Sequence, residues 1–124
     1  MEASIKKQNL NNEFYTPENC FITELSNSPD DPAASIARAR VQPGETTRWH
    51  RLSVGTIERY YIISGKGRVE IGNLKPENVN PGDVVLIPPM CRQRITNTGS
   101  EDLIFLAICT PRYKAEAYED IEER

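Results

Sequence analysis

The sequence is 124 residues long, the size of a single domain, and its hydrophobic (38%) and charged (27%) fractions are those of an ordinary globular protein. Its net charge of −3 differs from the net positive charge that nucleic-acid-binding domains normally carry. The only histidine is His50, so one chain cannot supply a three-histidine zinc site, a two-histidine iron site or a Cys2His2 finger.

The N-terminal segment, residues 1–19, is predicted to form a polar arm, and it lacks the apolar stretch of a signal peptide. No apolar run is long enough to span a bilayer. The three cysteines are odd in number and widely spaced, which favours reduced thiols over a disulfide framework. We therefore expect a cytoplasmic protein that binds neither membranes nor nucleic acids.

Most of the chain has the period-two hydrophobic pattern of half-buried strands, with Ser35, Ala37, Ala39 and Val41 on one face of the clearest example. Turn signals such as Pro43-Gly44 separate the segments, and many short strands with Gly and Pro between them predict an all-β sandwich or barrel. The predicted strands are 21–25, 35–41, 47–54, 59–64, 68–71, 83–87, 92–96 and 103–110. The last of these is apolar on both faces, which predicts a central strand.

Helical signal is confined to residues 113–123, which follow Pro111 and are predicted to form a short C-terminal helix. The last eleven residues hold two basic and five acidic side chains, as is typical of a solvated tail. The predicted organisation is one domain with an arm at 1–19, a barrel at 20–110 and a tail at 111–124.

Two stretches resemble the signature motifs of the cupin superfamily. They are PGETTRWHRLSVGTIERYYIISG at 43–65 and PGDVVLIPPMCRQRITN at 81–97. The first keeps Gly44, His50, Glu58 and Gly65, and the second keeps Gly82, Pro88 and Asn97. The resemblance implies a cupin jelly-roll barrel of two antiparallel sheets, with a site in the mouth of the barrel.

The resemblance also implies a reduced metal site. Two of the family's four ligand positions keep their residue, as His50 and Glu58, while Leu52 and Gln93 replace the other two. His50, Glu58 and the amide oxygen of Gln93 would coordinate a divalent ion such as Zn²⁺, Ni²⁺, Mn²⁺ or Fe²⁺. The alternative is a metal-free pocket in which Glu58 hydrogen-bonds His50, Tyr60 or Gln93.

Strand parity provides an independent view of the same residues. His50 and Leu52 share one face, as do Glu58, Tyr60 and Ile62, and as do Gln93, Ile95 and Asn97. If these faces line the barrel, they form a mostly apolar pocket with a few polar groups, as ligand sites do. Without metal, Glu58 and His50 would form an acid–base pair, with Tyr60 as a proton donor.

Three arginines and a cysteine are further candidates. Arg38 and Arg40 share one face of a strand and, with Arg48 and Gln93, are candidate ligand-binding residues for a small anion. The alternative for Arg38 and Arg40 is an outer face with salt bridges. Cys91, near the expected mouth, is a candidate soft ligand or reactive thiol.

Three functions remain open from the sequence. One is a metal-dependent enzyme that acts on a small organic acid or sugar, and another is a non-catalytic module that binds a small anion. The least favoured is a nucleotide-sugar epimerase-like cupin, which needs phosphate-binding residues beside its base. The resemblance further implies a homodimer formed through the arm and an outer sheet face, with Phe14, Tyr15 and Phe21 as anchors.

Overall fold

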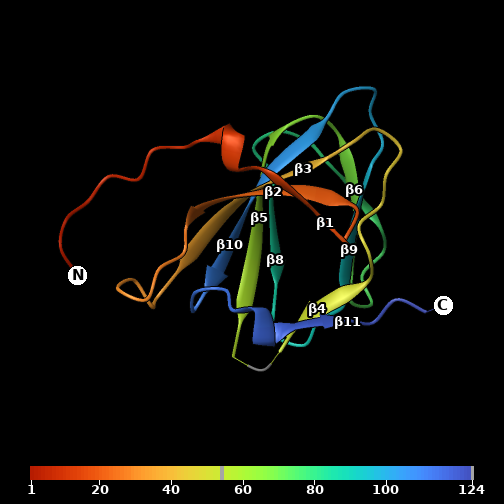
Figure 1. Cartoon of the computed structure of the whole chain (residues 1–124). Coiled ribbons are helices and arrows are strands. Elements are labelled where there is room, and N and C mark those ends of the chain that lie inside the picture. The colour runs from red at the N-terminus through yellow and green to blue at the C-terminus, as the bar shows by residue number, and fades with distance from the viewer. Residues whose placement is uncertain (54, 124) are drawn as a thin grey trace.

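In the computed structural model, which describes residues 1–53 and 55–123, two antiparallel sheets face each other around a shared interior (Figure 1). The first sheet has the strand order β1 (Phe14–Thr16), β2 (Cys20–Ser26), β3 (Ser35–Val41), β10 (Leu103–Thr110), β5 (Ile57–Ser64) and β8 (Val84–Ile87). The second has the order β11 (Tyr118–Asp120), β4 (His50–Leu52), β9 (Gln93–Asn97), β6 (Gly67–Ile71) and β7 (Glu77–Val79). The cupin barrel predicted from the sequence is confirmed.

The period-two pattern decides which side chains enter the barrel. On β5, Glu58, Tyr60 and Ile62 are buried, while Tyr61 and Ile63 between them are exposed. The same alternation buries His50 and Leu52 on β4, and Gln93, Ile95 and Asn97 on β9. The predicted faces are therefore those that line the interior.

The predicted strands correspond closely to eight observed ones, and β10 lies centrally between β3 and β5 as expected. The strand predicted over 47–54 is shorter, because the chain before His50 follows β9 through Thr46 and Thr47 without regular pairing. Val54 and Arg124, the last residues of that strand and of the predicted tail, lie outside the described residues. Strands β1, β7 and β11 were not predicted.

The predicted C-terminal helix is wrong. The segment contains a 3₁₀ turn, η2 (Ala115–Ala117), followed by β11, which pairs with β4 so that Tyr118 lies opposite Leu52 and Asp120 opposite His50. Pairing with β4 satisfies backbone groups that would otherwise lie on an open sheet edge. Ion pairs from Arg51 to Glu119 (3.0 Å) and from Arg48 to Asp120 (2.9 Å) accompany it. These tertiary contacts outweigh the weak local preference for a helix.

Two motif positions show why the barrel keeps its shape. Gly65 has φ +86°, and a Cβ there would lie 2.6 Å from the carbonyl oxygen of Asp102, so only glycine fits. The second cupin motif normally has a glycine at the position that Met90 occupies in this chain. Met90 still adopts the left-handed backbone conformation that glycine favours, at φ +63°. Its backbone N–H donates to the Leu52 carbonyl at 2.8 Å, which ties this loop to β4 beside His50.

The outer surface of β5 and β8 exposes the apolar side chains of Tyr61, Ile63, Val84 and Leu86. None of the helical segments in the described part of the chain combines the length and hydrophobicity needed to cross a lipid bilayer.

Candidate functional site

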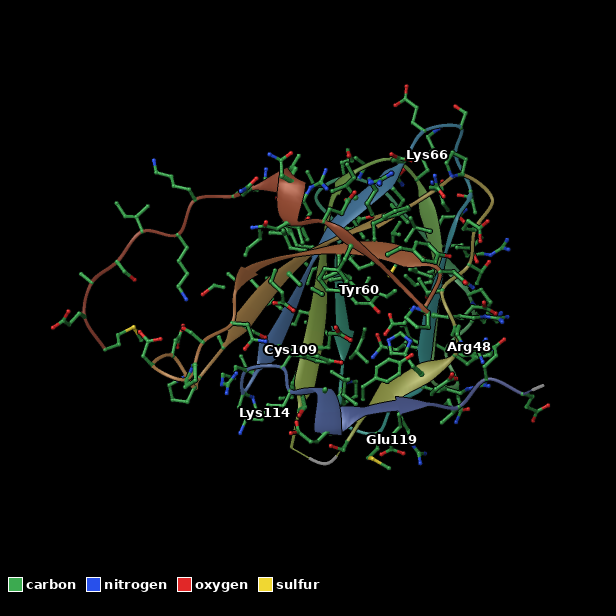
Figure 2. The ribbon with its side chains drawn as sticks, viewed as in Figure 1. Arg48, Tyr60, Lys66, Cys109, Lys114 and Glu119 are labelled. Atoms are coloured by element: carbon green, nitrogen blue, oxygen red, sulfur yellow. The ribbon has the colours of Figure 1, made fainter. Side chains whose placement is uncertain are left out.

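A cavity of about 190 Å³ opens between the two sheets and is lined by residues from both, from the arm and from the C-terminal segment. Its volume is below the roughly 300–1,000 Å³ typical of sites for drug-sized molecules, so it suits a smaller ligand. In Figure 2, Tyr60 and Cys109 lie in the interior, while Arg48 and Glu119 lie near the β4–β11 edge. The polar and aromatic lining residues are Thr16, Glu18, Cys20, Glu24, Ser35, Thr47, His50, Glu58, Tyr60, Phe105, Cys109, Tyr113 and Tyr118, with Phe14 beside them.

His50 is held in one orientation by two contacts. Its Nδ1 lies 2.8 Å from the carbonyl oxygen of Arg48, and because a carbonyl only accepts, Nδ1 carries the proton and donates. The imidazole also stacks on the ring of Tyr118, with 5.3 Å between centroids and 25° between planes. His50 is only 4% exposed and lines the cavity. Its Nε2 therefore carries the basic lone pair within the site.

Glu58 is a buried carboxyl close to this histidine. Burial raises its pKa to about 7, against the opposing charge of His50. Its Oε2 accepts a long 3.7 Å contact from the Cys109 thiol, but its Oε1 has no hydrogen-bond partner among the described residues. The side-chain amide of Gln93 also interacts with this carboxyl and lowers its pKa, and the Gln93 Nε2 is likewise without a hydrogen-bond partner among the described residues. The floor of the barrel therefore holds a buried donor and a buried acceptor that are both unsatisfied.

Tyr60 and Gln93 form a pair deeper in the barrel. The Tyr60 hydroxyl donates to Gln93 Oε1, and burial raises the pKa of that hydroxyl well above its ordinary value. The ring of Tyr60 packs on Phe105 at 4.5 Å between centroids. Tyr60 is therefore held as a neutral donor, and Gln93 lies behind it rather than among the residues that line the cavity.

The residues present do not fit a resident divalent ion. Leu52 cannot coordinate, and the oxygen of Gln93 is already bonded by Tyr60. His50 and Glu58 remain as two protein donors, fewer than the three that catalytic zinc sites generally use. Within the described ranges, no three His, Cys, Asp or Glu side chains are placed to hold one ion. The donor set instead favours the metal-free alternative that the sequence left open, in which the Glu58 carboxyl interacts with the side chain of Gln93.

The candidate arginines do not enter the cavity. Arg38 and Arg40 lie on the outer face of β3 and pair with Glu13 at 3.4 and 2.7 Å, and Arg40 also pairs with Asp102. This is the salt-bridged outer face that the sequence offered as the alternative. Arg48 pairs with Asp120 and is likewise not among the residues that line the cavity. Each of these guanidinium groups therefore forms an ion pair with a carboxylate outside the site.

Cys91 does not have the environment of a reactive thiol. It is not among the lining residues, and burial raises the pKa of its thiol, with only partial opposition from Arg92. Reactive cysteines need a lowered pKa.

The sequence missed several lining residues, among them two glutamates and two tyrosines. Glu18 and Glu24 come from the arm and from β2, and Tyr113 and Tyr118 come from the tail. For Glu24 a signal existed, because it shares strand parity with Cys20 and Ile22. The other three lie in segments predicted to be an arm and a solvated tail, so no local pattern marked them.

Comparison with known proteins agrees with the fold. Residues 37–109 match the family model described as "Cupin domain". The chain is similar to glucose-6-phosphate isomerase of Thermococcus onnurineus (45% identity, 51% of this chain, 33% of the relative). It is also similar to oxalate decarboxylase OxdC of Bacillus subtilis (30% identity, 82% of this chain, 26% of the relative). The chain thus spans a third or less of the length of these two relatives.

Among solved structures, the barrel is similar to Pac13, a nucleoside dehydratase. The TM-score is 0.76 at 17% identity, with 96% of this chain and 92% of the other covered. A variant of that Streptomyces protein is also known with uridine. At this identity the likeness shows the fold.

Proposed function

The chain belongs to the cupin domain family, and from that premise we propose that it is an enzyme that moves a proton on a small polar molecule, using His50 and no resident metal ion. The observation that carries the proposal is the hydrogen bond from His50 Nδ1 to the Arg48 carbonyl, which leaves Nε2 as the base inside the cavity. A second group supports it, since the raised pKa of Glu58 in a cleft is typical of functional sites.

The chemistry is a reversible proton transfer. His50 Nε2 accepts a proton from a carbon or oxygen of the substrate, and the resulting imidazolium returns a proton to the product. When Glu58 is ionised, its charge stabilises that imidazolium. The Tyr60 hydroxyl, held by Gln93, is a positioning group that fixes the floor of the site.

The charged residues that line the cavity limit the charge that the substrate can carry. Its carboxyl-bearing residues are Glu18, Glu24 and Glu58, and no lysine or arginine is found among its lining in the part of the chain that the structure describes. Oxalate and glucose 6-phosphate, for which the two relatives are named, are anions that such a lining would repel. A nucleotide-sugar epimerase and an anion-binding module face the same difficulty. An uncharged or a positively charged molecule has no such conflict, and the similar barrel is known with the uncharged molecule uridine.

A solvent-exchange screen tests the proposal. The protein is incubated in D2O with uncharged sugars, nucleosides and other small hydroxy-carbonyl compounds, before and after dialysis against a chelator. We expect mass spectrometry to find deuterium on carbon in at least one compound, at a rate that the chelator does not change. Exchange that appears only after a divalent ion is restored would contradict a metal-free site, and no exchange in any compound would support a binding module.

The homodimer and the cytoplasmic location stay predictions. For the dimer, the exposed apolar side chains on β5 and β8 provide a contact face of the expected kind.

A further inference from the structure

The charges inside the cavity are unbalanced. Glu58 is buried, Glu18 is half-buried and Glu24 is exposed, and all three line the cavity. None of these three takes part in the ion pairs recorded for residues 1–53 and 55–123, whereas Arg38, Arg40, Arg48, Arg51 and Arg94 are all paired outside the cavity. At mildly alkaline pH, where Glu58 is ionised as well, the side chains that line the cavity carry a net negative charge.

The aromatic lining lies beside the same carboxylates. Tyr118 stacks on His50, and Tyr113, five residues earlier in the chain, also lines the cavity. Burial is the larger cause of the raised pKa of both tyrosines, and the charge of Glu18 adds to it, which places that carboxylate within electrostatic reach of both rings. Carboxylates among aromatic faces are the surroundings that bind organic cations, because ring faces are electronegative.

Glu58 supplies a buried acceptor at the floor of the site, where the amide Nε2 of Gln93 is likewise without a hydrogen bond. The Glu58 carboxyl lines the cavity and is 8% exposed, and its Oε1 accepts no hydrogen bond within the described residues. A buried acceptor of this kind normally has a partner. A metal ion is a poor candidate for this partner. Among the described residues, no three Asp, Glu, Cys or His side chains lie close enough together to coordinate one ion. Carboxylates spread around the cavity suit a larger, organic cation.

We infer that the ligand of this cavity carries a positively charged amine, held by the carboxylates of Glu18, Glu24 and Glu58 and covered by the rings of Tyr113 and Tyr118. The inference rests on the proposed function only in taking this cavity as the ligand site. It extends that function by naming the charge of the substrate.

Two matched pairs of probes test the charge directly. Choline is compared with 3,3-dimethylbutan-1-ol, its uncharged isostere in which carbon replaces nitrogen, and ethanolamine, which stays protonated at mildly alkaline pH, is compared with ethylene glycol. Calorimetry at mildly alkaline pH is expected to show at least one cation binding about tenfold or more tightly than its neutral partner, the scale of one well-placed charge contact. Glu18→Gln and Glu24→Gln should each reduce that ratio several-fold. Glu70→Gln, whose carboxylate pairs with Arg94 outside the cavity, is the matched control and should leave the ratio unchanged.

The inference is overturned if neither cation binds more tightly than its neutral partner. It is also overturned if the preference persists undiminished in the Glu18→Gln, Glu24→Gln double variant, because the cation would then be bound elsewhere. A charge preference in a protein that exchanges no deuterium would reject the proposed catalysis and uphold the cationic ligand. If uncharged compounds exchange deuterium and no cation is preferred over its neutral partner, the cationic ligand is rejected and the proposed catalysis is upheld.

Discussion

Replacing His50 with glutamine is expected to lower deuterium exchange on the best compound of the screen by at least about 100-fold, the lower end of what a general base contributes. Glutamine keeps a side-chain amide that can donate to the Arg48 carbonyl, so the local fold should persist. It has no basic nitrogen to replace Nε2. The measurement is the exchange rate by mass spectrometry, with ligand affinity and thermal unfolding measured beside it.

Arg59→Gln is the control for this variant. Arg59 lies on β5 between Glu58 and Tyr60 and points the other way, with its guanidinium donating to Thr110 at 2.9 Å. Exchange in this control should remain within about twofold of the unsubstituted protein, since the change is remote from the reacting atoms. If His50→Gln retains full exchange while both variants stay folded, His50 is not the base.

Replacing Glu58 with glutamine is expected to remove a pH dependence from the stability of the protein. The folded-state pKa of Glu58, about 7, lies above its ordinary value of 4.5, so the folded protein holds this proton more tightly than the unfolded chain does. The free energy of unfolding therefore falls as pH rises from 4.5 to about 7, and the stabilisation is fully present only below that window. This pKa shift corresponds to a decrease in the free energy of unfolding on the order of 3 kcal/mol across that pH window.

Glutamine resembles the protonated carboxyl and cannot ionise, so the Glu58→Gln protein should lose less stability across this window. At mildly alkaline pH it should be more stable than the unsubstituted protein by a similar amount, on the order of 3 kcal/mol. Denaturant unfolding over a pH series measures both quantities. Glu70→Gln is the control with the opposite sign, because a hydrogen bond from Arg94 lowers the pKa of Glu70. Equal pH slopes in the Glu58→Gln and unsubstituted proteins would mean that Glu58 is not a buried, hard-to-ionise carboxyl.

The fold was largely predictable because its strands bury one face, and a period of two is visible in a single sequence. The alternation of Glu58, Tyr60 and Ile62, and of Gln93, Ile95 and Asn97, is enough to predict that those side chains lie inside the barrel, where the structure has them. The motif glycines were equally informative, since a residue such as Gly65 reports a backbone geometry that other residues resist.

The rest depended on contacts between distant segments. Nothing local to Tyr118 shows that it pairs opposite Leu52 and stacks on His50, because that strand forms only against the open edge of β4. Arg38 and Arg40 share a face in the sequence, but only the position of Glu13 shows that this face lies outside. The sequence therefore predicted the barrel and its histidine, while the charge of the cavity became visible only in three dimensions.

The most direct test of the account is the tautomer of His50. Because His50 is the only histidine, a long-range ¹H–¹⁵N spectrum contains one imidazole and needs no assignment. At mildly alkaline pH, we expect Nδ1 of His50 to be protonated and Nε2 to be unprotonated. The ¹⁵N chemical shifts of both nitrogens should stay the same when one equivalent of Zn²⁺ is added. A proton on Nε2, or a shift of that nitrogen on addition of zinc, would contradict the claim that His50 is a free base in a metal-free barrel.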